Sequence, residues 1–151
     1  MSLRYTMRSQ MFAKSLTMPM VEGAIKRLEM LKTQPERREK LWKIAHALQS
    51  GLKADGMNIG ITNSMVTPVY LSGSVAEGMQ VVFDLRENYN LFCSIVVYPV
   101  IPKGQLLLRL IPTAEHTMED VEYTIKAFKN VAEKLANGEY NKELLVDASK
   151  L

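Results

Sequence analysis

Two apolar, strand-like runs constrain the fold more than any other feature of the sequence: residues 91–98 (LFCSIVVY) and residues 105–111 (QLLLRLI). The six residues between them, PVIPKG, combine two prolines with a final glycine, which is typical of a wide, rigid turn. The two runs are therefore predicted to pair as a hairpin of antiparallel strands.

Helical periodicity precedes these strands. Residues 17–32 repeat apolar side chains at spacings of three and four, at Val21, Ala24, Leu28 and Leu31. A second helix is predicted to start with Thr33 as its N-cap, Pro35 in its first turn and Glu36 as the capping-box partner. It is expected to end at Ala54, before Asp55 and Gly56, and to bury one apolar face formed by Leu41, Ile44, Ala45, Leu48 and Leu52.

One more strand and two more helices are expected. Residues 65–72 (MVTPVYLS) are predicted as a strand, in which Pro68 favours an edge position or the strand start. Ser74 and Glu77 form the capping box of a helix that is expected to turn one side to the core, formed by Val75, Met79, Val82 and Phe83. Thr117, with Asp120 at the third position, is predicted to cap the last helix, which has an apolar stripe of Val121, Ile125, Phe128, Val131, Ala132 and Leu135.

The expected order of elements is α-α-β-α-β-β-α. It favours an α+β fold with a small, mainly antiparallel sheet, helices packed on one face of that sheet and a long connecting helix before it. Residues 1–15 are interpreted as a lead-in segment, in which residues 1–3 fit an expression scar as well as a natural start. Residues 138–151 are interpreted as a polar tail that frays.

Composition narrows the class of protein. A chain of 151 residues with 47% hydrophobic and 23% charged residues is long enough for one globular domain with a real core. The net charge of +3 is spread along the chain, so no nucleic-acid-binding face is expected. No run reaches the roughly 18 to 20 apolar residues of a membrane span, and no signal segment opens the chain. The single cysteine, Cys93, lies in an apolar run and is predicted as a core residue. A chain with one cysteine cannot form an internal disulfide, which favours a reducing, cytoplasmic location.

Arg109 is the one charged residue of the run QLLLRLI. Strand alternation puts Leu106, Leu108 and Leu110 on one face, and Arg109 on the other face with Leu107 and Ile111. An arginine keeps its charge, so a partly dehydrated guanidinium needs an anion. The anion can be a carboxylate or a helix C-terminus of the protein itself. It can instead be the carboxylate of a ligand, bound by two parallel hydrogen bonds. If the side chain is simply exposed, no such anion is needed. The pattern alone leaves these alternatives open.

A longer pattern adds a resemblance. A proline-rich turn, a strand with an arginine and a helix start A-x-H-T follow one another here as Pro99, Pro102, Gly104, Arg109, Ala114, His116 and Thr117. Together with the helices before it, this pattern resembles the carboxy-terminal part of the α-oxoamine synthases over about residues 4–136. These pyridoxal 5′-phosphate enzymes condense an amino acid with an acyl-CoA and release carbon dioxide. They include 8-amino-7-oxononanoate synthase, glycine C-acetyltransferase and serine palmitoyltransferase.

The resemblance implies roles for a few residues. Arg109 matches the arginine that binds the carboxylate of the amino-acid substrate. Ser15 matches a serine near the cofactor phosphate of the neighbouring subunit, although Ala13 and Lys14 depart from the family's pattern there. Lys14 is interpreted as a solvated or phosphate-proximal lysine and not as the Schiff-base lysine, because the residues after it match the segment downstream of that lysine. His116 is expected to orient the turn before the last helix.

The resemblance also implies what the chain lacks. The Schiff-base lysine, the partner of the pyridine nitrogen and the ring-stacking histidine belong to the large domain, which precedes the matched part. Residues 16–137 are therefore interpreted as the small domain of a larger acyltransferase, with no catalytic or metal-binding residue and no cofactor of its own. Its expected partners are the large domain of the same polypeptide, a second subunit in a homodimer, and the amino acid and acyl-CoA. The alternative is a free-standing binding or interaction module with the same fold and no catalysis.

Overall fold

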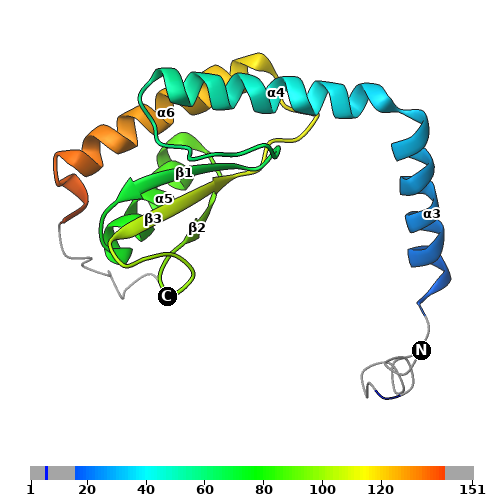
Figure 1. Cartoon of the computed structure of the whole chain (residues 1–151), viewed down its shortest axis with the longest axis horizontal. Coiled ribbons are helices and arrows are strands. Elements are labelled where there is room, and N and C mark those ends of the chain that lie inside the picture. The colour runs from blue at the N-terminus through cyan, green and yellow to red at the C-terminus, as the bar shows by residue number, and fades with distance from the viewer. Residues whose placement is uncertain (1–5, 7–15, 142–151) are drawn as a thin grey trace. The chain divides into compact units, whose positions relative to one another are not determined.

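The computed structural model describes Thr6 and residues 16–141. The elements follow one another as α3, α4, β1, α5, β2, β3, α6 and the short 3-10 helix η1 (Figure 1). The chain divides into two compact units, residues 1–36 and residues 37–151, and all strands belong to the second. The predicted order of elements and the predicted α+β class are both confirmed.

Helix α3, Met18–Thr33, lies in the first unit. Thr17 precedes it in an extended conformation, and a proline in the first turn suits the helix start, where a missing N–H costs nothing. Lys26 and Glu29 form an ion pair of 2.9 Å one turn apart. No residue of α3 is buried, and Leu28 and Leu31 of the predicted apolar stripe are exposed.

Helix α4, Pro35–Ala54, starts two residues after α3 ends. The prediction that Thr33 caps α4 is wrong, because Thr33 is the last residue of α3 and its hydroxyl donates a hydrogen bond to the carbonyl of Glu29 at 2.9 Å. Proline explains the break, since Pro35 has no N–H to continue the hydrogen bonds of α3 but fits the first turn of a new helix. The predicted end is confirmed, with Gly56 in a left-handed conformation at φ 79°.

The sheet has three strands in the order β1-β3-β2, and both neighbouring pairs are antiparallel. Strand β1, Thr67–Ser72, occupies one edge, so the prediction from Pro68 of an edge strand is confirmed. Strand β3, Gln105–Leu110, lies in the centre. Strand β2, Ser94–Val96, is much shorter than the predicted 91–98, because turns hold both of its ends: Leu91 N–H bonds to Leu85 and Val100 N–H to Val97.

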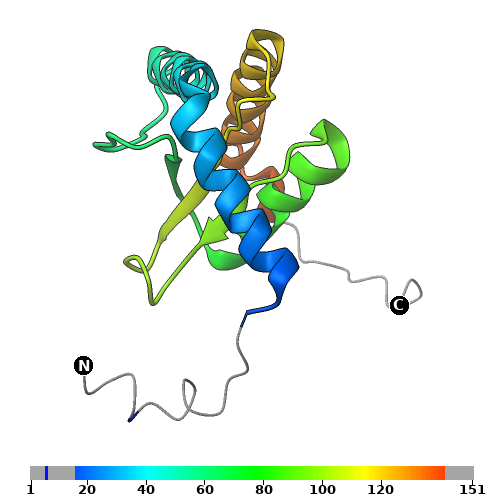
Figure 2. The same cartoon turned by 90° about the vertical axis from the view of Figure 1, so that its right-hand side faces the viewer.

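Helices α4, α5 (Val75–Tyr89) and α6 (Met118–Ala136) cover one face of this sheet (Figure 2). Their side chains and those of β1 and β3 form one apolar cluster, which includes Leu48, Leu52, Val69, Val81, Leu85, Leu108, Val121, Phe128 and Val131. The leucines predicted to face the helices, Leu106, Leu108 and Leu110, are all buried. The helices-on-one-face arrangement is thus confirmed.

Helix α5 has the predicted capping box, but it presents a different side to the core. The Ser74 hydroxyl accepts from Glu77 N–H at 3.2 Å, and Ser74 N–H donates to the Glu77 carboxylate at 2.6 Å. Of the predicted side, Val82 is partly buried against the core, but the prediction is wrong for Val75, Met79 and Phe83, since Met79 is 53% and Phe83 65% exposed and Val75 is also exposed.

Close packing at Gly78 explains why α5 buries a different side from the predicted one. The buried residues of the helix are Gly78, Val81, Asp84 and Leu85. A Cβ atom at Gly78 would lie 2.6 Å from Ile95 Cδ1 and 2.8 Å from Leu106 Cδ2. The missing side chain therefore lets the helix backbone approach the sheet at this point.

Helix α6 begins at the predicted cap, where the Thr117 hydroxyl accepts from Asp120 N–H at 3.2 Å. Of its predicted buried stripe, Val121, Phe128 and Val131 are buried and Ile125, Ala132 and Leu135 are partly buried, and Ala127 is buried as well. After α6 the chain forms η1, Glu139–Asn141. The expectation that the chain frays after Gly138 is wrong for these three residues, because Tyr140 is buried and donates a hydrogen bond to Asp84.

Candidate functional site

Arg109 lies on the face of β3 opposite the helices, as strand alternation predicted, and its side chain is exposed. Its Cα pairs with Pro68 on β1 and with Ser94 on β2. Arg109 Nε donates a hydrogen bond to Ser94 Oγ at 3.1 Å. Within the part of the chain that the structure describes, no carboxylate forms an ion pair with Arg109. Of the alternatives left open by the sequence, a protein carboxylate as partner is not found there, whereas simple exposure of the side chain is observed.

We define the open face of the sheet as the face of β1, β3 and β2 away from the helices, where Leu107 precedes Arg109 on β3. Leu107 and Ile111 flank Arg109 along the chain, and Ile111 is 60% exposed. Phe92, two residues before Ser94, is 84% exposed. The N–H groups of Arg109 that are not bonded to Ser94 remain as donors. A cation of this kind near apolar groups is chemically suited to an anion that also carries apolar surface.

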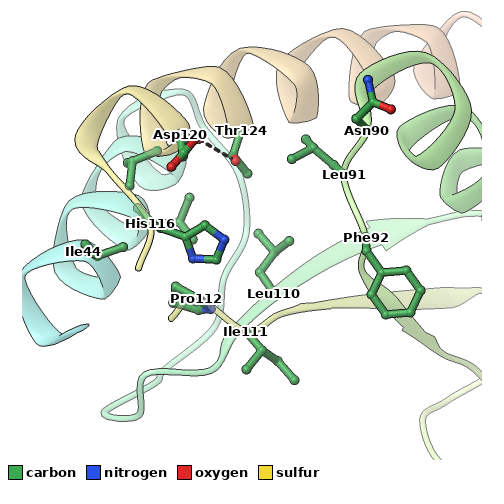
Figure 3. A pocket seen from close by; sticks show the side chains of 12 residues that line it. Ile44, Asn90, Leu91, Phe92, Leu110, Ile111, Pro112, His116, Asp120 and Thr124 are labelled. Atoms are coloured by element: carbon green, nitrogen blue, oxygen red, sulfur yellow. Dashed lines mark hydrogen bonds between the residues drawn. The ribbon is translucent and has the colours of Figure 1, made fainter. Parts of the chain in front are cut away.

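A cavity of about 380 Å³ opens at the end of β3, on the helix side of the sheet (Figure 3). Its walls are largely apolar, with Ile44, Leu48, Leu110 and Val121 among them, and His116, Asp120, Thr124 and Asn90 add polar groups. Arg109 is not one of its lining residues. Arg109, an exposed cation without an ion pair among the described residues, therefore lies outside this cavity, and we take it as the centre of the candidate site.

His116 organises the turn before α6. Its Nδ1 accepts a hydrogen bond from the backbone N–H of Thr113 at 2.9 Å, and the Thr113 hydroxyl lies 3.2 Å from the same nitrogen. An acceptor nitrogen carries no proton, so the neutral imidazole holds its proton on Nε2. Figure 3 shows the ring projecting between Pro112 and Thr124. These contacts fit the turn-orienting role that was expected.

Asp120 completes the helix cap beside His116. Hydrogen bonds from the Thr117 backbone and hydroxyl, at 2.7 and 3.0 Å, lower the pKa of this exposed carboxyl below its ordinary value. Nearby, Arg37 pairs with Glu115 at 3.2 Å. Both interactions fix the backbone that leads from β3 into α6, and so they hold the end of the strand that carries Arg109.

Cys93 is buried in the core, as predicted. Burial raises the pKa of its thiol to about 11. Since the thiolate is the reactive form, burial disfavours the reactive form of this cysteine at neutral pH.

A polar cluster that the sequence did not reveal joins α5, α6 and η1. Asp84, only 7% exposed, accepts from Asn88 Nδ2 at 2.6 Å, from Lys134 Nζ at 2.8 Å and from the Tyr140 hydroxyl. Lys134 Nζ also lies 5.5 Å from the centre of the Tyr89 ring. The one signal in the sequence was an aspartate among the apolar residues of α5. Its hydrogen bonds join three elements of the fold, which indicates a structural role.

The donors around Arg109 suit an anion but do not provide a complete site for pyridoxal 5′-phosphate. Its two cross-strand neighbours are a proline and a serine, and neither can form the covalent link that a lysine makes with this cofactor. Ser15 and Lys14, which were considered for the phosphate, lie outside the described residues. Among Thr6 and residues 16–141, no group of three His, Cys, Asp or Glu side chains is placed to hold a metal ion.

Within the same residues, every helix is too short or too polar to span a lipid bilayer.

Comparison with known proteins identifies relatives of the chain. No protein-family model matches it. It is 59% identical over 138 residues to a cysteate-C-fatty acyltransferase of Capnocytophaga ochracea, covering 91% of this chain and 33% of the relative. It is 33% identical to an 8-amino-7-oxononanoate synthase of Alkaliphilus oremlandii, covering 85% of this chain and 32% of the relative.

A similar fold occurs in a serine palmitoyltransferase of S. paucimobilis solved with a pyridoxal 5′-phosphate–myriocin aldimine. The TM-score is 0.76 and the identity 28%, over 90% of this chain and 34% of that one. The chain thus spans about a third of the length of the proteins that it matches. Over that span the chain is similar to these proteins in sequence and in fold, which confirms the resemblance noted around Arg109.

Proposed function

We propose that the complete polypeptide carrying this chain is a pyridoxal 5′-phosphate-dependent acyltransferase, which condenses an amino acid with an acyl-CoA and releases carbon dioxide. Residues 16–141 act in it as the carboxy-terminal small domain. The proposal is supported by the relatives, among them a fatty acyltransferase at 59% identity. The observation that carries the chain's own part in it is the exposed guanidinium of Arg109, which no described carboxylate neutralises.

Arg109 binds the carboxylate of the amino acid in this proposal. Two terminal guanidinium nitrogens match the two oxygens of a carboxylate in parallel hydrogen bonds, which fix direction as well as distance. The neighbouring apolar side chains, Leu107 and Ile111, strengthen this attraction once the rest of the polypeptide covers them and water is excluded. Pyridoxal 5′-phosphate, held by the rest of the polypeptide, supplies the electron sink for the bond changes at Cα. A carboxylate held at a fixed angle presents the correct Cα bond for cleavage.

We place the substrates in the fatty acyl branch. The relative at 59% identity is named for transfer of a fatty acyl group to cysteate, and the relatives at 28–33% identity include an 8-amino-7-oxononanoate synthase and a serine palmitoyltransferase. The higher identity favours a fatty acyl-CoA as donor and a small, polar amino acid such as cysteate or serine as acceptor.

The rest of the same polypeptide is the first partner in this proposal. It covers the open face of the sheet and completes the cleft around Arg109. A homodimer is the second expected partnership. Exposed apolar side chains support both, because Phe92 and Ile111, next to the ends of β2 and β3, are largely exposed in the chain itself.

Product analysis tests the function. The complete polypeptide, purified with pyridoxal 5′-phosphate, is incubated with palmitoyl-CoA or acetyl-CoA and with cysteate, serine, alanine or glycine in turn. We expect a long-chain amino ketone, detected by mass spectrometry, together with released carbon dioxide and free CoA. Condensation with acetyl-CoA but not with palmitoyl-CoA would show that the acyl donor is not a fatty acyl-CoA. Absence of condensation with every pair would reject the proposal in favour of a binding module.

A further inference from the structure

Ser94 is the polar side chain that contacts Arg109 in the described chain. The two residues are directly opposite each other in the β2–β3 pair, so both side chains lie on the open face of the sheet. Ser94 is half-buried, whereas Arg109 is exposed. The hydroxyl is therefore the better fixed of the two groups, and the 3.1 Å hydrogen bond ties the mobile guanidinium to it.

The atom that makes this bond limits how the guanidinium can bind a carboxylate. A guanidinium has five N–H groups, one on Nε and two on each Nη. It can grip a carboxylate side-on, through Nε and one Nη, or end-on, through both Nη atoms. The Nε–H of Arg109 is already donated to Ser94 Oγ, so the end-on pair is left for a ligand.

The other neighbours of Arg109 cannot replace Ser94. Its second cross-strand partner is Pro68, and its neighbours along the same face are Leu107 and Ile111. None of these side chains has a hydrogen-bond acceptor. Without the Ser94 hydroxyl, the long arginine side chain would be free to rotate about its terminal bonds, and binding would have to overcome that rotamer entropy.

We propose that Ser94 is a positioning residue, which holds the Arg109 guanidinium with its end-on fork directed at the substrate carboxylate. This rests on the proposed function of Arg109 and adds the residue that sets the geometry of the clamp. Ser94 is not a catalytic residue, because it acts through Arg109.

A matched pair of variants isolates the hydroxyl. Ser94→Thr keeps the hydroxyl, and Ser94→Val replaces it by a methyl group of nearly the same shape; both β-branched side chains suit a strand. In the complete polypeptide, we expect Ser94→Val to raise the KM for the amino acid about tenfold, the upper range for one hydrogen bond. The Thr variant should stay within about twofold of the unmodified protein, and the KM for the acyl-CoA should be unchanged in both. Equal KM values for the amino acid in the Val and Thr variants would overturn the proposal.

A double-mutant cycle with Arg109→Ala tests whether Ser94 acts through Arg109. We expect Ser94→Val to have no further effect on the KM for the amino acid once Arg109 is alanine. An undiminished effect in that background would overturn the positioning role. The cycle also separates the two proposals: if Arg109→Ala raises the KM and Ser94→Val does not, the clamp stands and the role of Ser94 fails. If Arg109→Ala leaves the KM unchanged, the clamp itself fails.

Discussion

Asp84 shows how one buried carboxylate ties three elements of the domain together. It lies on α5 and receives hydrogen bonds from Lys134 on α6 and from Tyr140 on η1. Burial by itself would raise its pKa, but the hydrogen bonds from Lys134, Tyr140 and Asn88 outweigh this and hold the pKa of Asp84 below its ordinary value. Burial and the bond to Asp84 raise the pKa of Tyr140, which therefore stays protonated and keeps donating.

We expect Tyr140→Phe to lower the free energy of unfolding by about 1 to 2 kcal/mol, because the phenolic hydroxyl donates to a nearly buried charge. Asp84→Ala should cost about 3 kcal/mol, since it leaves the donors without their acceptor. Tyr123→Phe is the matched control, because Tyr123 is exposed on the same helix as Lys134, and its effect should be within about 0.5 kcal/mol. Urea unfolding followed by circular dichroism measures all three. Equal effects of Tyr140→Phe and Tyr123→Phe would show that the hydrogen bond from Tyr140 to Asp84 does not stabilise the fold.

The lowered pKa of Asp84 also predicts how stability depends on pH. In the unfolded chain the carboxyl has its ordinary pKa of 3.8, and in the folded protein it is lower. The folded state therefore gains stability from Asp84 above the unfolded pKa, and loses it as the pH falls through the folded pKa.

Other carboxylates with lowered pKa values, Glu77 and Asp120, contribute in the same pH range, so the comparison must isolate Asp84. We expect the Asp84→Asn variant to lose less stability than the unmodified protein when the pH falls below 3.8. Unfolding by urea at a series of pH values measures the difference. Parallel curves for the two proteins would contradict the role of the ionised Asp84.

At the scale of elements, Gly78 sets how closely α5 approaches the sheet. Alanine in a helix interior normally stabilises relative to glycine by about 0.5 to 1 kcal/mol. At Gly78 the added Cβ would meet Ile95 and Leu106 at less than 3 Å, so we expect Gly78→Ala to destabilise the domain by about 1 to 3 kcal/mol instead.

Gly23 of α3 is the matched control. A Cβ atom there would meet only the flexible end of Arg27, at 3.5 Å, so Gly23→Ala should increase the helicity of α3. Urea unfolding measures the first variant, and circular dichroism at low denaturant measures the second. A stabilising effect of Gly78→Ala would mean that α5 does not pack against the sheet at this point.

Local chemistry made parts of the elements predictable from sequence. The capping boxes at Ser74 and Thr117 involve residues three positions apart, and both are present. The buried side of α5 was not predictable in the same way, because Val75, Met79 and Phe83 form one apolar stripe and Val81 and Leu85 belong to another. Packing at Gly78 against the distant Leu106 decides between them, and periodicity carries no information on that contact.

In the candidate site, too, local patterns were predictable from the sequence and contacts between distant residues were not. Strand alternation was enough to place Arg109 on the face away from the helices. Its contact with Ser94 depends on the register between β2 and β3, which the sequence does not specify. The Asp84 cluster joins residues 50 and 56 positions apart, beyond the reach of any local pattern.

At the scale of the whole molecule, the open face of the sheet carries the exposed Arg109, and large apolar side chains are exposed at the adjoining ends of β2 and β3. Ile111 is 60% exposed and Phe92 84% exposed. The proteins that the chain matches are about three times longer. Both facts fit a domain whose open face is completed by other parts of a larger protein.

We expect the isolated chain to self-associate through this face, because large exposed apolar side chains favour association. Size-exclusion chromatography with light scattering measures the mass of the particle at increasing concentration. Phe92→Ser should shift the association to higher concentration, whereas Phe83→Ser on α5 is a control that leaves the open face intact. A strictly monomeric particle at high concentration would contradict this prediction.

The most direct test of the central claim is the affinity of the complete polypeptide, with and without Arg109→Ala, for an amino acid and for the amine that lacks its carboxylate. Titration calorimetry measures the four dissociation constants. If Arg109 grips the carboxylate, the unmodified protein binds the amino acid more tightly than the amine, by about 2 to 5 kcal/mol for a paired charge, and Arg109→Ala removes most of this preference. The same preference in both proteins would show that the carboxylate is bound elsewhere.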